Sequence, residues 1–203
     1  MLHKTTRTLA ILATALLTAC STPSPKAIAT TQETSVMAPG DHKIVNPALS
    51  AEEISKRFLK LLGNIKSRSD LSVETIKEST GLTLEIDGKN AGYLSTDFGN
   101  GWRYKLVYIG ESPAVLRGVG LYLVNREESE SMAPVCTFNF DDYHHALKAM
   151  GYDDTPIYGE IGQLMDWRYY KNDITLSIRL RELTPRGHEG RPQNCVVFIG
   201  TLN

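Results

Sequence analysis

The chain has 203 residues, with 22 Lys and Arg against 23 Asp and Glu, so its formal net charge is −1. A chain without a basic excess has no strong field to gather nucleic acid by charge alone. Its composition is otherwise that of an ordinary globular protein, with 41% hydrophobic residues.

The N-terminus has the layout of an export signal. Lys4 and Arg7 precede an apolar run from Leu9 to Leu17, which is too short to span a bilayer comfortably as a helix. The run ends in Leu17-Thr18-Ala19-Cys20, which resembles a bacterial lipobox. This resemblance implies that residues 1–19 are removed and that Cys20 carries acyl chains, which anchor a protein to a membrane. An ordinary signal peptide with a chance cysteine is the alternative.

The residue after the cysteine, Ser21, is not the Asp associated with inner-membrane retention, so the resemblance implies an outer-membrane lipoprotein that faces the periplasm. Removal of residues 1–19 takes away two basic residues and no acid, which moves the formal net charge from −1 to −3. Residues 20–46 are rich in Ser, Thr, Pro and Ala without apolar periodicity, which predicts a flexible tether. The folded domain is expected over 47–203, with possible halves 47–134 and 135–203.

Two cysteines remain beside Cys20, namely Cys136 and Cys195. In an oxidising periplasm we expect them to form a disulfide that closes a long loop. A catalytic thiol is the less favoured alternative, since only His144 and His145 are candidate partners for it.

Two helices are predicted before any strand. Around 49–66, Ser50 and Glu53 have the spacing of a capping box, and Leu49 and Ile54 have the spacing of a hydrophobic staple. A second, shorter helix is expected from a cap at Ser72 to a terminating glycine, Gly81.

Alternating segments then predict an antiparallel sheet. Four strands are expected in the first half, and a short extended piece at 136–140 leads into a helix that ends near Gly151. Four more strands follow this helix. The predicted class is α+β, an antiparallel sheet with helices on one face, built as a tandem duplication of a helix-plus-sheet unit. The expected strands are 82–86, 91–98, 101–110, 115–125, 156–161, 163–171, 173–180 and 194–202.

A repeated tripeptide suggests the duplication. Trp102-Arg103-Tyr104 and Trp167-Arg168-Tyr169 lie 65 positions apart, although a chance repeat is the alternative. Alternation places each Trp and Tyr on one sheet face and the Arg on the other. The favoured interpretation packs Trp102, Tyr104, Trp167 and Tyr169 beneath the helices, because large aromatics are core material. In the alternative they line an open sheet face and bind a protein partner.

No phosphate loop, metal-binding motif or nucleophile motif is found, so no catalytic residue, metal or cofactor is predicted. His144 and His145 lie on the predicted second-half helix. We expect His145 to form a helical pair with the Asp141 carboxylate, in preference to a role as a metal ligand or general base.

The long loop at 181–194 is either a surface connector or a second partner-binding element. Its candidate binding residues are Arg181, Arg186, His188 and Arg191. The element order over residues 50–203 resembles the tandem repeat of β-lactamase-inhibitor-type folds and, for one unit, small outer-membrane assembly lipoproteins. This resemblance implies a protein that binds another protein through a curved sheet. Such a protein would inhibit a toxin or a wall-degrading or lipolytic effector, or confer immunity to it. The alternatives are an envelope-assembly or scaffold lipoprotein, and an enzyme that uses His144 or His145.

Overall fold

The computed structural model describes residues 45–126, 131–183 and 193–202, all within a compact unit that spans Lys43–Asn203. The described residues form three α-helices, one short 3-10 helix and eight strands. Their bounds are α1 (Ala51–Asn64), η1 (Arg68–Asp70), α2 (Val73–Thr80), β1 (Glu85–Asp87), β2 (Asn90–Leu94), β3 (Arg103–Ile109), β4 (Gly118–Val124), α3 (Phe140–Ala149), β5 (Asp153–Tyr158), β6 (Leu164–Lys171), β7 (Ile174–Leu183) and β8 (Gln193–Thr201).

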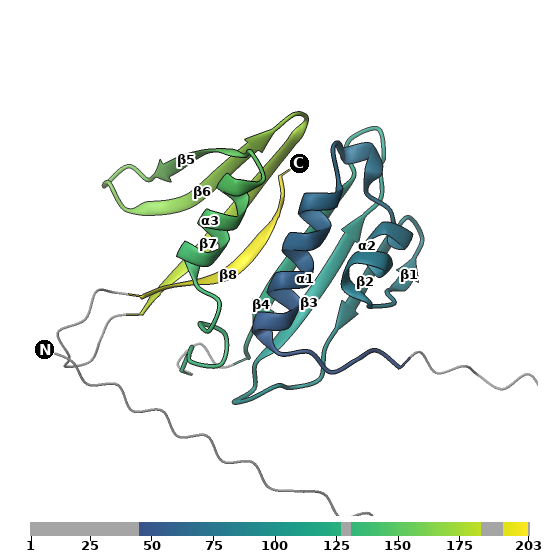
Figure 1. Cartoon of the computed structure of the whole chain (residues 1–203), viewed down its shortest axis with the longest axis horizontal. Coiled ribbons are helices and arrows are strands. Elements are labelled where there is room, and N and C mark those ends of the chain that lie inside the picture. Colours follow the sequence, from purple (N-terminus) through teal and green to yellow (C-terminus); the bar gives the residue numbers. More distant parts are fainter. Residues whose placement is uncertain (1–44, 127–130, 184–192, 203) are drawn as a thin grey trace, which may run out of the picture. The chain divides into compact units, whose positions relative to one another are not determined.

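The strands form one antiparallel sheet in the order β1-β2-β3-β4-β8-β7-β6-β5, with the helices on one side of it (Figure 1). In each half a helical segment precedes a meander of four strands. The last strands of the two meanders, β4 and β8, pair with each other at the centre of the sheet. The predicted α+β class, an antiparallel sheet with helices, is therefore confirmed.

Local sequence signals account for the helix ends. The Ser50 side chain accepts a hydrogen bond from the Glu53 N–H, and the Glu53 carboxylate accepts one from the Ser50 N–H. α2 starts at the predicted cap, Ser72, and ends at Gly81, whose φ of 73° is left-handed. The cap of α3 is Asn139, whose side chain accepts hydrogen bonds from the two following aspartate N–H groups.

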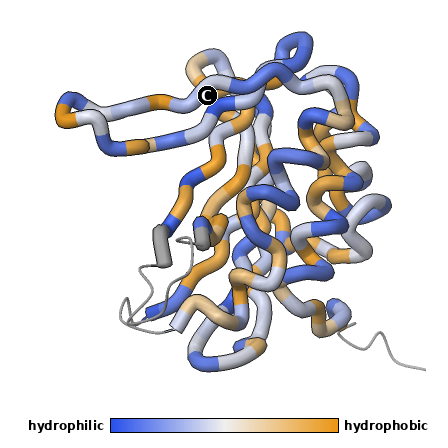
Figure 2. The backbone as a smooth tube through the Cα atoms, turned by 60° about the vertical axis from the view of Figure 1, so that its left-hand side comes forward, coloured by the Kyte–Doolittle hydropathy of each residue, from blue (hydrophilic) through white to orange (hydrophobic). Residues whose placement is uncertain are grey.

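Hydrophobic and hydrophilic residues alternate along the helices and strands (Figure 2), and the hydrophobic ones form a continuous core between sheet and helices. The largest fully buried side chains include one tryptophan and four tyrosines. Burial raises the pKa of Tyr152 to about 12. It raises the pKa of Tyr104, Tyr143 and Tyr169 further above the usual tyrosine range.

Arg68 ties the two halves together from η1, an element that the sequence analysis did not predict. Its buried guanidinium donates hydrogen bonds to the carbonyl oxygens of Asp173 and Arg117, at 3.0 Å each, and of Leu202. These carbonyls lie beside the start of β7, before β4 and after β8. The Arg68 side chain therefore holds one end of each of the strands β4, β7 and β8.

Several predicted strands have other bounds in the structure: the one expected at 91–98 ends at Leu94, and the one expected at 156–161 is Asp153–Tyr158. β1 begins at Glu85 and not at residue 82, because the backbone of Thr83 is hydrogen-bonded to the Asn46 side chain. The Thr83 N–H donates to the side-chain oxygen at 2.7 Å, and the side-chain amide donates to the Thr83 carbonyl at 2.9 Å. The prediction of a short extended segment at 136–140 is wrong. The chain turns at 133–137, where the N–H groups of Val135 and Cys136 both donate to the Met132 carbonyl.

The structure does not show a tandem duplication. Each half repeats the order of helix and four strands, but the two Trp-Arg-Tyr triplets fall on strands that do not correspond. Trp102 lies directly before β3, the third strand of its half, whereas Trp167 lies in β6, the second strand of its half. The shared tripeptide therefore does not mark equivalent positions.

Candidate functional site

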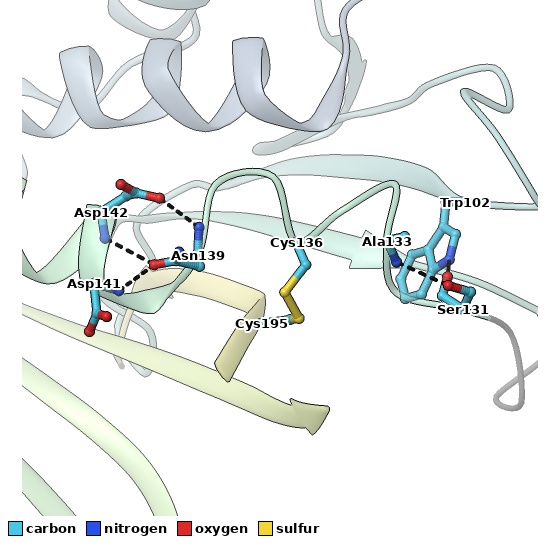
Figure 3. Close-up of a disulfide and its surroundings, with 8 residues drawn as sticks. All are labelled: Trp102, Ser131, Ala133, Cys136, Asn139, Asp141, Asp142 and Cys195. Carbon is cyan, nitrogen blue, oxygen red and sulfur yellow. Dashed lines mark hydrogen bonds between the residues drawn. A yellow bond between two sulfur atoms is a disulfide. The ribbon is translucent and has the colours of Figure 1, made fainter. Parts of the chain in front are cut away.

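The aromatics of the repeated tripeptide lie on the helix-covered side of the sheet. Trp102, Tyr104 and Tyr169 are buried, and the Trp102 indole N–H donates to the Ser131 carbonyl at 2.9 Å (Figure 3). They lie where the favoured interpretation placed them. The alternative of an open partner-binding surface made by these three side chains is wrong, because their strands turn them toward the core.

Trp167 is half-buried and belongs to a cluster between α3 and the β5–β6 hairpin. Its ring packs 4.9 Å from the Phe140 ring, and its indole N–H donates to the Asp154 carboxylate at 3.1 Å. The Lys148 ammonium, 2.6 Å from the same carboxylate, and then the indole hold the pKa of Asp154 below its usual range. This cluster joins α3 to the edge of the sheet.

Both histidines of α3 already have partners within the domain. His144 Nδ1 lies 2.8 Å from the Tyr169 hydroxyl. His145 Nδ1 bonds the backbone carbonyl of Asp141 at 2.8 Å, and not the carboxylate that the sequence analysis expected. Among the described residues, no group of three or more His, Cys, Asp and Glu side chains is placed to hold a metal ion.

Cys136 and Cys195 lie at disulfide distance, with their Cα atoms 5.0 Å apart (Figure 3). The pair ties the loop before α3 to the first residues of β8. Of the other predicted binding residues, Arg181 lies half-buried in β7 opposite Cys195. The remaining predicted residues lie outside the described part of the chain, namely Cys20, Arg186, His188 and Arg191.

The helix-free face of the sheet carries two aromatic side chains at its centre. Tyr122 of β4 and Phe198 of β8 are direct cross-strand partners, with ring centroids 4.6 Å apart. Their strand neighbours, Leu121 and Ile199, are buried beneath the helices, so the two rings point to the opposite side. We call Tyr122 and Phe198 the aromatic plate.

Glycines at positions 120 and 200 leave room for the rings of the aromatic plate to pack against the sheet. A Cβ at Gly120 would lie 3.1 Å from the Phe198 ring and 3.2 Å from the Tyr122 ring. A Cβ at Gly200 would lie 2.8 Å from the same phenylalanine ring. Glycine inside a strand marks such a close approach, and here it lets both rings, tilted 41° to each other, pack against the backbone of the two central strands.

Two cations flank the plate in the same cross-strand row. The Arg179 guanidinium stacks over the Phe198 ring, 4.5 Å from its centroid, and Lys105 is the direct partner of Tyr122 on the other side. Both side chains belong to exposed residues. Neither forms an ion pair with a carboxylate in the described parts of the chain, whereas Arg168 on the same face pairs with Asp166. Arg179 is thus an oriented cation that pairs with no carboxylate among the described residues.

The face continues past Lys105 into a shallow hollow of about 430 Å³ over β1–β3. Gly92, Leu94 and Val107 line it together with the acidic residues Glu85 and Asp87, and Leu94 is half exposed. The hollow and the plate lie side by side because Leu94, Lys105 and Tyr122 are successive cross-strand partners.

A second exposed apolar surface is the far end of the β5–β6 hairpin, at the edge of the sheet (Figure 1). Residues 158–166 of this hairpin have no partner in β7, since the β6–β7 ladder starts at Trp167. Its large exposed side chains are Tyr158, Ile161, Leu164 and Met165, and Ile161 is 89% exposed.

No protein-family model, curated protein or solved structure matches this chain. The resemblance of its element order to β-lactamase-inhibitor-type folds therefore stays a prediction. In the described segments, none of the helices combines the length and the apolar character that a membrane crossing requires.

The sequence analysis placed both plate residues in predicted strands but did not select them. The signal was present in the glycines at 120 and 200, since glycine in a strand interior suggests that another group approaches the backbone closely. The aromatics of the Trp-Arg-Tyr repeat lie on the helix-covered side of the same sheet.

Proposed function

We propose that this protein is a periplasm-facing outer-membrane lipoprotein that binds another protein through the helix-free face. It would act as an inhibitor of, or immunity protein against, a toxin or a wall-degrading or lipolytic effector. The observation that carries the proposal is the aromatic plate with Arg179 stacked on it. Tyrosine and arginine dominate the binding energy of many protein interfaces, and a rigidly held side chain loses little entropy when a partner docks.

The shape of the face favours a protein as the ligand. Small-molecule sites are concave and surround most of their ligand, whereas the plate packs against the sheet without enclosing a cavity and the hollow beside it is shallow. The helix-free side of β4, β8 and β7 offers a broad surface that another protein can cover. This argument supports a binding module over an enzyme.

The compartment is supported by the cysteines. A cysteine pair with a sequence separation of 59 suits an oxidising environment, because thiols in the cytosol are kept reduced. Acyl chains on Cys20 and the tether at 20–46 would hold the domain at the inner side of the outer membrane.

A capture experiment with matched variants tests the proposal. The purified full chain is used as bait on the envelope fraction of the producing bacterium and on proteins secreted by its competitors. Tyr122→Ala with Arg179→Ala removes the half-buried Tyr122 ring and the exposed cation stacked on Phe198, which is itself only 9% exposed. Tyr170→Ala with Arg168→Ala is the control, since it removes the same two residue types from β6 on the same face.

The expected result is one secreted hydrolase or toxin that is retained by the parent and the control and lost by the plate variant, with the activity of that protein suppressed only when it is retained. Equal capture by the parent and the plate variant, both folded by circular dichroism, would remove the support for this face.

One observation favours the alternative of an envelope-assembly scaffold. A scaffold joins at least two partners, and the apolar tip of the β5–β6 hairpin is a second exposed surface, separate from the plate. A deletion strain with a leaky outer membrane and normal resistance to rival cells would support this alternative.

A further inference from the structure

We infer that the partner surface is acidic: it presents two carboxylates, one to Lys105 and one to Arg179, about 14 Å apart, with an apolar side chain between them on the aromatic plate. This inference rests on the proposed function and adds the chemistry of the partner. It concerns one row of side chains that crosses the middle of the sheet.

The row follows from the strand register. Leu94, Lys105, Tyr122, Phe198 and Arg179 are successive cross-strand partners on β2, β3, β4, β8 and β7. No acid occurs among these five residues. The nearby carboxylates do not pair with the two cations: Glu85 and Asp87 line the hollow beside Lys105 without an ion pair to it, and Asp166 binds Arg168 and Ser177. A partner that covers the row and supplies negative charge avoids burying the two cations unpaired, which is costly.

Four other basic residues of the described chain form ion pairs, whereas Lys105 and Arg179 do not. Ion pairs join Lys56 to Glu52, Arg117 to Glu111, Lys148 to Asp154 and Arg168 to Asp166. Lys105 and Arg179 have no such partner in the described parts of the chain. Stacking on Phe198 occupies a flat side of the Arg179 guanidinium and leaves its edge donors to bind a carboxylate.

The spacing predicts the arrangement of the partner groups. Lys105 and Arg179 lie three inter-strand steps apart, which is about 14 Å. Four residues of an extended chain span about the same length, and residues i, i+2 and i+4 point to one side. An extended segment with acids at i and i+4 and an apolar residue at i+2 therefore matches the row when it lies across the strands.

A synthetic peptide tests this match on the full chain. The probe is acetyl-Thr-Glu-Thr-Leu-Thr-Glu-Thr-amide. One control peptide has Gln in place of both Glu, and another has its two Glu moved to i and i+2. Binding is followed by nuclear magnetic resonance titration of the parent, of Lys105→Gln with Arg179→Gln, and of Arg168→Gln, which removes a cation that already has a counter-charge.

We expect the Gln peptide to bind about tenfold more weakly than the Glu peptide, because two exposed ion pairs are lost. The same loss is expected for Lys105→Gln with Arg179→Gln, but not for Arg168→Gln, and 1 M salt should abolish the difference by screening. Equal affinity for the Glu and Gln peptides, or no binding of any peptide, would overturn the inference. A partner captured through the plate without dependence on Lys105 and Arg179 would leave the proposed function intact and refute only its acidic character.

Discussion

Replacement of Gly200 by alanine should destabilise the domain, although alanine is normally the better residue in a strand. A Cβ at this position would lie 2.8 Å from the Gly120 Cα, the Val119 carbonyl oxygen and the Phe198 ring. Two of these three contacts are backbone atoms and cannot rotate away. Overpacking costs about 1–3 kcal/mol, and three contacts at 2.8 Å place this site in the upper half of that range, at about 2–3 kcal/mol. The lower chain entropy of alanine returns about 0.5–1 kcal/mol, so the expected net loss is about 1–2.5 kcal/mol.

Gly92→Ala is the matched control for this substitution. Gly92 lies in β2 on the same sheet face, but a Cβ there would meet only the Leu106 carbonyl oxygen, at an ordinary 3.6 Å. The entropy gain then stands without a packing cost, so we expect a stabilisation of about 0.5 kcal/mol. The same chemical change should therefore have opposite effects at two positions of one sheet.

Urea unfolding followed by circular dichroism measures both effects as shifts of the midpoint at constant slope. The reasoning is refuted if Gly200→Ala is as stable as the parent, or if both variants shift in the same direction. Either outcome would mean that the rings of the aromatic plate do not lie against the sheet as described.

Three further outcomes are expected. Replacement of Cys136 and Cys195 by alanine should lower the free energy of unfolding by up to about 4 kcal/mol, worked from the length of the closed loop and measured by urea unfolding. Arg68→Met should cost more than about 3 kcal/mol, because three carbonyls lose a donor, whereas an equally stable variant would show that solvent replaces it. Asp154→Asn should be less stable than the parent near neutral pH. Lys148 lowers the folded pKa of Asp154, so the difference in stability is present above the unfolded pKa of about 4 and vanishes as pH falls through the folded pKa. Acid unfolding of the parent and the variant, followed side by side by circular dichroism, measures this difference.

The parts of the fold that were predictable are those set by neighbouring residues. The Ser50–Glu53 capping box and the left-handed Gly81 are decided within one helical turn, and the structure has both. The start of β1 was not predictable in this way. It depends on Asn46, whose side chain bonds Thr83 across 37 residues of sequence.

The candidate site was less predictable than the fold, because it depends on which strands become neighbours. Alternation shows that Tyr122 and Phe198 each lie on one face of a strand. It does not show that β4 and β8 pair, nor that their register brings the two rings together. The Trp-Arg-Tyr repeat was misleading for the same reason, since a local identity carries no information about the position of a strand within the sheet.

The central pairing of β4 with β8 bears on the synthesis of the chain. β4 is complete before the second half of the sheet has been made, whereas β8 is the last strand of the sheet to be synthesised. The plate takes one ring from each strand, so neither half presents it alone, and a chain that stops before residue 193 lacks Phe198 altogether. A partner that requires both rings discriminates chains with a complete sheet from nascent or truncated ones, and its binding reports that β8 has joined the sheet.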